Sequence, residues 1–108
     1  MLKINRDNSI ELTRGDTARI ELAINGDDGK PYDFSEDTVL FTIKDSTVSV
    51  EPLLQKTVTD GVIYLAPTDT ELMQYGDYVY DVELTMQSGD VCTVITPARF
   101  TLTPEVTW

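Results

Sequence analysis

Apolar and polar residues alternate with a period of two along most of the chain. The strongest alternation covers residues 78–86, where one face is formed by Tyr78, Tyr80, Val82, Leu84 and Met86. The same period covers residues 18–24, where the apolar face is formed by Ala18, Ile20, Leu22 and Ile24. Such alternation is typical of a β-strand with one buried face and one face in water.

Shorter stretches predict further strands. Ile10 and Leu12 indicate a short strand that ends at Gly15, and residues 39–44 form a compact apolar strand. Toward the end of the chain, Pro97 separates a strand over 91–96 from one over 98–103. The segment 45–52 is rich in turn residues and weakly patterned, so we expect a loop or an edge strand that stops at Pro52.

Glycine-containing turns connect these strands. Residues 25–29 supply an asparagine and two glycines, which favour a chain reversal. Residues 53–58 and 62–66 flank Thr59-Asp60-Gly61, and the Asp-Gly pair predicts a tight hairpin between them. Residues 87–90 predict another reversal between the last two long strands.

One segment, residues 68–75, has helical character. Thr68 stands three residues before Glu71, which matches a capping box, and Gly76 suits the position that ends the helix. A helix of about two turns is too short for recognition of nucleic acid, so we expect a connector between strands. A glycine and then Tyr78 follow it, as in the corner before strand F of immunoglobulin-like folds, where a tyrosine hydroxyl binds nearby backbone.

The composition supports an all-β fold. Thr, Val and Ile account for 32 of 108 residues (15, 10 and 7), and β-branched side chains favour strands. We find no internal repeat or linker, so residues 1–108 are predicted to be a single domain. Short strands at regular spacing with one helical turn predict an immunoglobulin-like antiparallel β-sandwich with one short helical connector.

Charge excludes several classes of partner. Eight basic and 19 acidic residues give a net charge of −11, which repels nucleic acid and anionic membrane surfaces. The chain has no histidine and one cysteine, Cys92, so we expect no cofactor, no metal site and no intrachain disulfide. Since no signal peptide or membrane-spanning apolar run is visible, we expect synthesis and folding in a reducing cytoplasm.

Three short motifs have simpler structural interpretations. Arg14-Gly15-Asp16 matches a tripeptide bound by adhesion receptors, but we interpret it as a plain turn. Asp27, Asp28 and Asp33 resemble calcium ligands, although they lack the spacing of a calcium loop, and an exposed acidic hairpin tip explains them better. Cys92 lies in a strand pattern, where a small buried apolar side chain is the usual role.

No arrangement of residues indicates catalysis, and we predict that the chain is not an enzyme. The serines lack the nucleophile-elbow motif and a histidine partner. With 19 acidic residues, some carboxylates will always lie close, so a carboxylate pair alone carries almost no information.

The C-terminus supplies the candidate partner-binding residues, Trp108 and Val106. Trp108 is the only tryptophan, and a large aromatic side chain at a terminus either packs back onto its own domain or contacts a partner. Both interpretations remain open, because tryptophan is also enriched among interface anchors.

The chain as a whole resembles small prophage proteins that are similar to the N-terminal domain of the upper baseplate protein of phages of low-GC Gram-positive bacteria. The resemblance rests on residues 13–17, 29–33, 39–44, 66–70, 76–84, 88–90 and 100–107. Its strongest part is Gly76-Asp77-Tyr78-Val79-Tyr80-Asp81-Val82-Glu83-Leu84. It covers nearly the full length, although each motif alone is short and structural.

The resemblance implies an immunoglobulin-like sandwich that acts by assembly, as a structural component of a phage or prophage tail. Its partners would be other phage tail proteins, with a homo-oligomer also possible, and it would be located in the virion after synthesis in the bacterial cytoplasm. The resemblance implies no catalytic residues. An alternative from another class is a carbohydrate- or calcium-binding accessory module, which would use exposed aromatic residues such as Tyr64 or Tyr75 on a concave sheet face.

Overall fold

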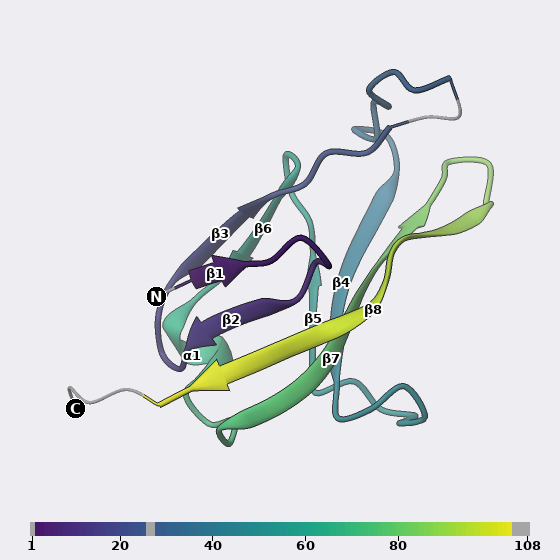
Figure 1. The fold of residues 1–108 in the computed structure, drawn as a ribbon. Helices are drawn as coiled ribbons and strands as arrows, with labels where there is room; N and C mark the ends of the chain where they lie inside the picture. Colours follow the sequence, from purple (N-terminus) through teal and green to yellow (C-terminus); the bar gives the residue numbers. More distant parts are fainter. Residues whose placement is uncertain (1, 26–27, 105–108) are drawn as a thin grey trace.

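The computed structural model describes residues 2–25 and 28–104, which form two β-layers (Figure 1). The larger sheet has six strands in the order β1–β2–β8–β7–β4–β5, and the smaller sheet pairs β3 with β6. The elements are β1 (Leu2–Ile4), β2 (Ile10–Thr13), β3 (Ala18–Glu21), β4 (Thr38–Lys44), β5 (Leu54–Thr57), β6 (Val62–Leu65), α1 (Pro67–Thr70), β7 (Gly76–Thr85) and β8 (Val91–Thr103).

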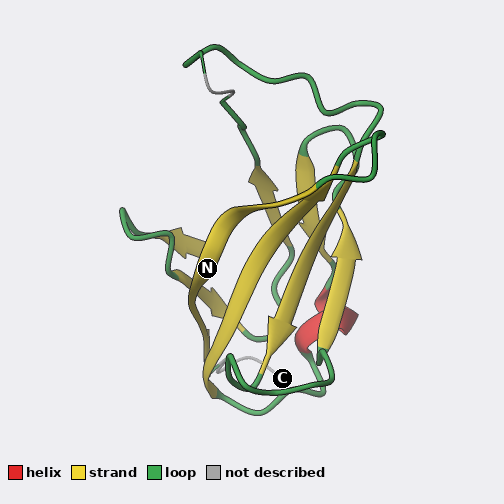
Figure 2. Cartoon of the chain, turned by 90° about the vertical axis from the view of Figure 1, so that its right-hand side faces the viewer, coloured by secondary structure: helices red, strands yellow, loops and turns green. Residues whose placement is uncertain are grey.

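The predicted all-β sandwich with one short helical connector is confirmed. The order β8–β7–β4–β5 corresponds to strands G, F, C and C′ of an immunoglobulin variable-type sheet, and β3 with β6 corresponds to strands B and E. One detail departs from the antiparallel prediction, since β2 pairs with β8 in parallel. Figure 2 shows the two layers, with the helical turn at one end of the smaller sheet.

Alternation along the strands builds the core between the layers. On β7, the side chains of Tyr80, Val82 and Leu84 are buried, as the pattern of residues 78–86 predicts. Phe41 on β4 and Phe100 on β8 are fully buried beside Tyr80, and the ring centroids of Phe41 and Tyr80 are 5.4 Å apart. This aromatic cluster joins the three central strands of the larger sheet.

The predicted hairpin between residues 53–58 and 62–66 is wrong, although its tight turn is present. Asp60 and Gly61 both have positive φ (54° and 74°), and Thr59 and Val62 exchange backbone hydrogen bonds. The strands then diverge, because β5 pairs with β4 in the larger sheet and β6 pairs with β3 in the smaller one. The turn therefore carries the chain from one layer to the other.

The two predicted strands on either side of Pro97 are a single strand, β8. Tyr80 pairs with Ala98 and Val82 with Ile95, so β8 holds one residue more than β7 between these pairs. A bulge of this kind accommodates a proline, which has no backbone N–H to donate to the ladder.

The helical connector is shorter and begins earlier than predicted. Ala66, not Thr68, precedes the first helical residue, and Pro67 occupies the first position, where a missing N–H costs nothing. The carboxylate of Asp69, not Glu71, accepts the N–H of Ala66 at 2.7 Å. The tyrosine corner is confirmed, since the hydroxyl of Tyr78 donates a 2.7 Å hydrogen bond to the carbonyl of Gln74.

Candidate interaction surface

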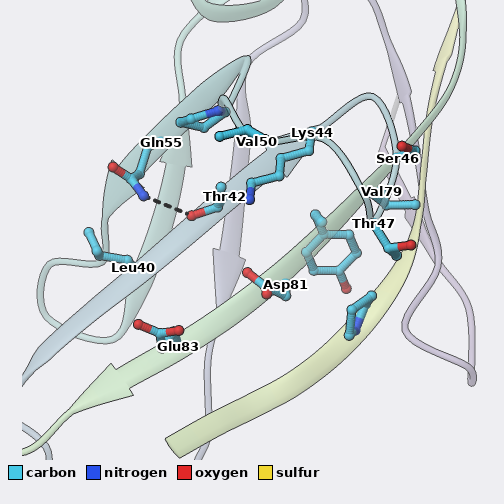
Figure 3. Close-up of a pocket in the computed structure, with 13 residues that line it drawn as sticks. Leu40, Thr42, Lys44, Ser46, Thr47, Val50, Gln55, Val79, Asp81 and Glu83 are labelled. Atoms are coloured by element: carbon cyan, nitrogen blue, oxygen red, sulfur yellow. Dashed lines mark hydrogen bonds between the residues drawn. The ribbon is translucent and has the colours of Figure 1, made fainter. Parts of the chain in front are cut away.

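The outer face of the larger sheet carries a half-open groove of about 420 Å³ (Figure 3). Strands β4 and β7 form its floor, β5 forms one side, and the loop of residues 45–53 forms the rim at one end. It is lined by Leu40, Thr42, Lys44, Ser46, Thr47, Val50, Pro52, Gln55, Val79, Tyr80, Asp81, Glu83 and Pro97. The groove combines two carboxylates, the ammonium group of Lys44, hydroxyls and apolar side chains.

Strand alternation places the floor residues on the outer face. Thr42 lies directly opposite Asp81, and Leu40 lies opposite Glu83, while their neighbours in sequence are buried. Gln55 on β5 donates a 3.1 Å hydrogen bond to the hydroxyl of Thr42, which fixes the side of the groove.

The rim loop, residues 45–53, is held by its own polar contacts. The N–H of Ser46 donates to the hydroxyl of Ser49 at 3.2 Å, and the N–H of Ser49 donates to the carbonyl of Ser46 at 3.1 Å. At the end of the loop, the N–H of Leu53 donates to the carbonyl of Ile43 at 2.8 Å. These bonds return the chain to β5 and confirm the loop that was predicted over residues 45–52.

Two carboxylates in the groove form no ion pair within the part of the chain that the structure describes. Asp81 and Glu83 stand two residues apart on β7 and therefore project from the same face (Figure 3). Within residues 2–25 and 28–104, neither of them forms an ion pair. A ligand or partner that supplies positive charge would therefore gain two attractive interactions at this floor.

The rim loop also exposes apolar side chains. Val48 and Val50 are 87% and 89% exposed, and Leu53 is 48% exposed. Isolated surface apolar residues are common, but three within six positions beside a groove form a patch typical of contact sites. Sequence reasoning missed this surface. The signal in the sequence was a pair of valines in a predicted loop. Because the loop has neither strand nor helix periodicity, nothing predicts that these side chains are buried.

The predicted partner-binding residues Trp108 and Val106 lie outside the described residues. The turn interpretation of Arg14-Gly15-Asp16 is confirmed, since Gly15 has a φ of 85° and the N–H of Asp16 donates to the carbonyl of Thr13. The guanidinium of Arg14 donates to the carbonyl of Met73 at 3.2 Å and to the hydroxyl of Tyr75 at 2.9 Å. Arg14 thus binds its own domain.

The acidic residues considered as calcium ligands serve turns instead. Asp27 lies outside the described residues. The carboxylate of Asp28 accepts the N–H of Lys30, and that of Asp33 accepts the N–H of Ser35, both at 3.0 Å. Hydrogen bonds from the backbone and side chain of Ser35 lower the pKa of Asp33. Across the described residues, no group of three or more Asp, Glu, Cys or His side chains could hold a metal ion.

The prediction that Cys92 is a buried apolar side chain is wrong, because Cys92 is exposed. It pairs with Leu84 near the tip of the β7–β8 hairpin, where β8 residues 91–93 are all exposed. Leu84, directly opposite Cys92 on β7, is only 3% exposed, so the exposure at this position concerns the β8 side of the hairpin.

The aromatic residues considered for carbohydrate binding do not line this groove. Tyr64 lies on β6 in the smaller sheet, and Tyr75 lies in the segment between α1 and β7. Each ring is faced by a guanidinium, that of Arg19 at 5.0 Å from the Tyr64 centroid and that of Arg14 at 4.2 Å from the Tyr75 centroid. A sugar that stacked on either ring would first have to displace the arginine.

Among the described residues, no helix has the length and apolar character needed to cross a membrane. Comparisons of the chain with protein-family models, with curated proteins and with solved structures find no match.

Proposed function

We propose that the chain is a structural component of a phage or prophage tail, of the baseplate type, that acts through protein–protein contacts. The proposal is carried by the rim loop, in which Val48 and Val50 are almost entirely exposed beside the groove. An immunoglobulin-like sandwich and the resemblance of residues 76–84 to phage baseplate domains are consistent with this role.

The groove defines the chemistry of the partner. Its apolar rim favours an apolar contact, and the unpaired carboxylates of Asp81 and Glu83 favour a partner segment that carries lysine or arginine. The net charge of −11 acts in the same direction, since it attracts a basic partner segment and keeps free subunits soluble before assembly.

Incorporation into particles tests this function. Phage particles are purified from a host that carries the prophage, and the chain is detected in them with an antibody. We expect wild-type chain in the particles, and we expect V48S/V50S to be depleted at least about fivefold, because the two serines lose the apolar burial that the valines would gain in the interface. Leu72→Ser is the matched control, since Leu72 is 92% exposed but lies beside α1, away from the groove.

The outcomes test separately the role as a tail component and the assignment of the rim loop as the contact surface. Particles without the wild-type chain would overturn the role as a tail component. Particles that contain V48S/V50S at the wild-type level would overturn the assignment of the rim loop, and so would an equal loss of Leu72→Ser. Circular dichroism of both variants establishes that the sandwich is intact.

A further inference from the structure

Strand β3 has a free edge. Among the described strands it pairs only with β6, in a sheet of two strands. Figure 1 shows it on the outside of that sheet, with β6 on its other side. Two-stranded sheets are marginal alone, and an unpaired edge is a template for another strand.

The backbone pattern identifies which groups are unpaired. The N–H of Leu22 donates to the carbonyl of Gly61 at 2.8 Å, so Leu22 and Gly61 form a hydrogen-bonded pair in the β3–β6 register. Hydrogen-bonded pairs alternate along an antiparallel ladder, so Ala18 and Ile20 also face β6. The backbone N–H and C=O groups of Arg19 and Glu21 therefore point away from β6, toward the free edge.

We propose that β3 pairs in an antiparallel manner with β3 of a second copy of this chain, about a twofold axis at Ile20. This inference goes beyond the proposed function, because it concerns self-association and a different face of the molecule. In this register, Arg19 of one copy lies opposite Glu21 of the other, and the relation is repeated across the axis. Each of these two pairs exchanges both backbone hydrogen bonds.

Charge selects this register from its neighbours. Arg19 and Glu21 are both exposed and lie on the same face of β3. The two neighbouring registers that keep the same backbone groups hydrogen-bonded have their twofold axis at Arg19 or at Glu21. The first places Arg19 opposite Arg19, and the second places Glu21 opposite Glu21. Opposite charges that face each other across a β-ladder stabilise it, and like charges destabilise it. Of these three registers, only the one centred on Ile20 places opposite charges against each other.

The inner face of β3 favours the same axis. Ile20 packs against the core but remains only partly buried, because it lies at the edge of the smaller sheet. Pairing about Ile20 brings the two isoleucines together as a non-hydrogen-bonded pair, in which the side chains are closest. The apolar surface left exposed by the free chain is then covered, and the two small sheets join as β6–β3–β3–β6.

The outer edges of the larger sheet do not offer this match. Self-pairing of β1 about its central residue would place Lys3 opposite Lys3. On β5, Lys56 is the only charged residue, so no pair of opposite charges can form across a twofold axis there. A twofold pairing through β3 also closes on itself and gives a dimer, not a filament.

Charge reversal tests the register directly. The association of wild type, R19E, E21R, an equimolar mixture of these two variants, and R19E/E21R is measured by sedimentation velocity from 1 µM to 1 mM. We expect a concentration-dependent wild-type dimer and an increase in Kd of about tenfold or more in each single variant, because both ion pairs become repulsive. The mixture and the double variant should recover dimerisation, since both restore opposite charges at both positions.

Matched controls carry the same changes in net charge elsewhere. Lys30→Glu and Glu36→Arg alter exposed residues in the segment before β4 and should leave Kd within about twofold of wild type. A wild-type chain that is monomeric up to 1 mM would overturn the inference, as would single variants that associate like wild type or a mixture that does not recover. None of these results bears on incorporation of the V48S/V50S variant into particles.

Cross-linking tests the axis independently. In a C92S background, I20C should form an intermolecular disulfide under mild oxidation, because the Cα atoms of a non-hydrogen-bonded pair are about 4.5 Å apart, within disulfide range. T17C is the control, since Thr17 would face Ala23 of the other copy and not itself. Equal cross-linking of I20C and T17C would overturn the register.

Discussion

The hydroxyl of Tyr80 on β7 donates a hydrogen bond to the backbone carbonyl of Asn8, which lies 72 residues earlier in the chain. Asn8 has a positive φ of 67° in the turn between β1 and β2, so the bond connects that turn to the aromatic cluster. The ring of Tyr80 is only 3% exposed. This contact joins the edge hairpin to the centre of the larger sheet.

Ionisation of Tyr80 lowers the stability of the folded state at alkaline pH. Burial, and then the negative charge of Asp7, raise the pKa of Tyr80 from 10.0 to about 12. The protonated phenol is favoured in the folded state, so its stabilisation is complete below pH 10 and is lost as the pH rises from 10 to 12. At about 1.36 kcal/mol per pKa unit, the loss is at most about 2.7 kcal/mol.

Tyr80→Phe should reduce this pH dependence, with the raised pKa of Tyr32 still contributing. It should also lower the free energy of unfolding at pH 7 by about 1 kcal/mol, because one hydrogen bond is lost. Urea denaturation at pH 7, 10 and 12 checks both effects. Tyr64→Phe, at an exposed tyrosine, should retain the wild-type slope between pH 10 and 12. An unchanged slope in Tyr80→Phe would contradict the assignment.

Phe41 is the centre of the core. It is fully buried, and its ring centroid lies 5.4 Å from that of Tyr80 and 6.3 Å from that of Phe100. Phe41→Ala should lower the free energy of unfolding by about 3–5 kcal/mol through lost burial and a cavity. Urea denaturation measures the change, and Phe41→Leu should cost clearly less. Equal stability of the Ala variant and wild type would show that the core does not depend on this ring.

Thr70 connects α1 to the turn that contains Arg14-Gly15-Asp16. Its side chain is fully buried, and its hydroxyl accepts the N–H of Gly15 at 2.9 Å. Thr70→Val should cost about 1–3 kcal/mol, because the N–H of Gly15 loses its acceptor. Hydrogen exchange of the Gly15 amide should accelerate in Thr70→Val and remain slow in Thr70→Ser, which retains the hydroxyl. Equal exchange in both variants would argue against this bond.

Gly61 permits the turn that carries the chain between the layers. Its φ is +74°. A Cβ at this position would lie 3.6 Å from the Leu22 carbonyl oxygen and from the Phe34 ring, which is ordinary van der Waals contact. The cost of a side chain here therefore comes from backbone strain and not from a steric clash. Gly61→Ala should cost about 1–2 kcal/mol, which lowers Tm by roughly 4–8 °C per kcal/mol. Calorimetry measures this change. Asp60→Asn is the control and should leave Tm unchanged, because asparagine tolerates positive φ.

Alternation along the chain predicted most of the strands and most of the core, but it missed β1 and extended β3 to residue 24, although β3 ends at Glu21. Tyr80, Val82 and Leu84 are buried as their period requires, because a period of two assigns a face to each side chain whatever strand lies alongside. Local chemistry also predicted the tyrosine corner at Tyr78 and the turn at Gly61, since both depend on residues close in sequence.

Only the tertiary structure decided which strands are neighbours and which edges remain open. The sequence around Asp60-Gly61 predicted a hairpin, but β5 and β6 belong to different sheets, because pairing with β4 and β3 involves partners distant in the chain. The free backbone groups at Arg19 and Glu21 follow from the β3–β6 register. Strand propensity does not predict that register, because it depends on which strand lies alongside.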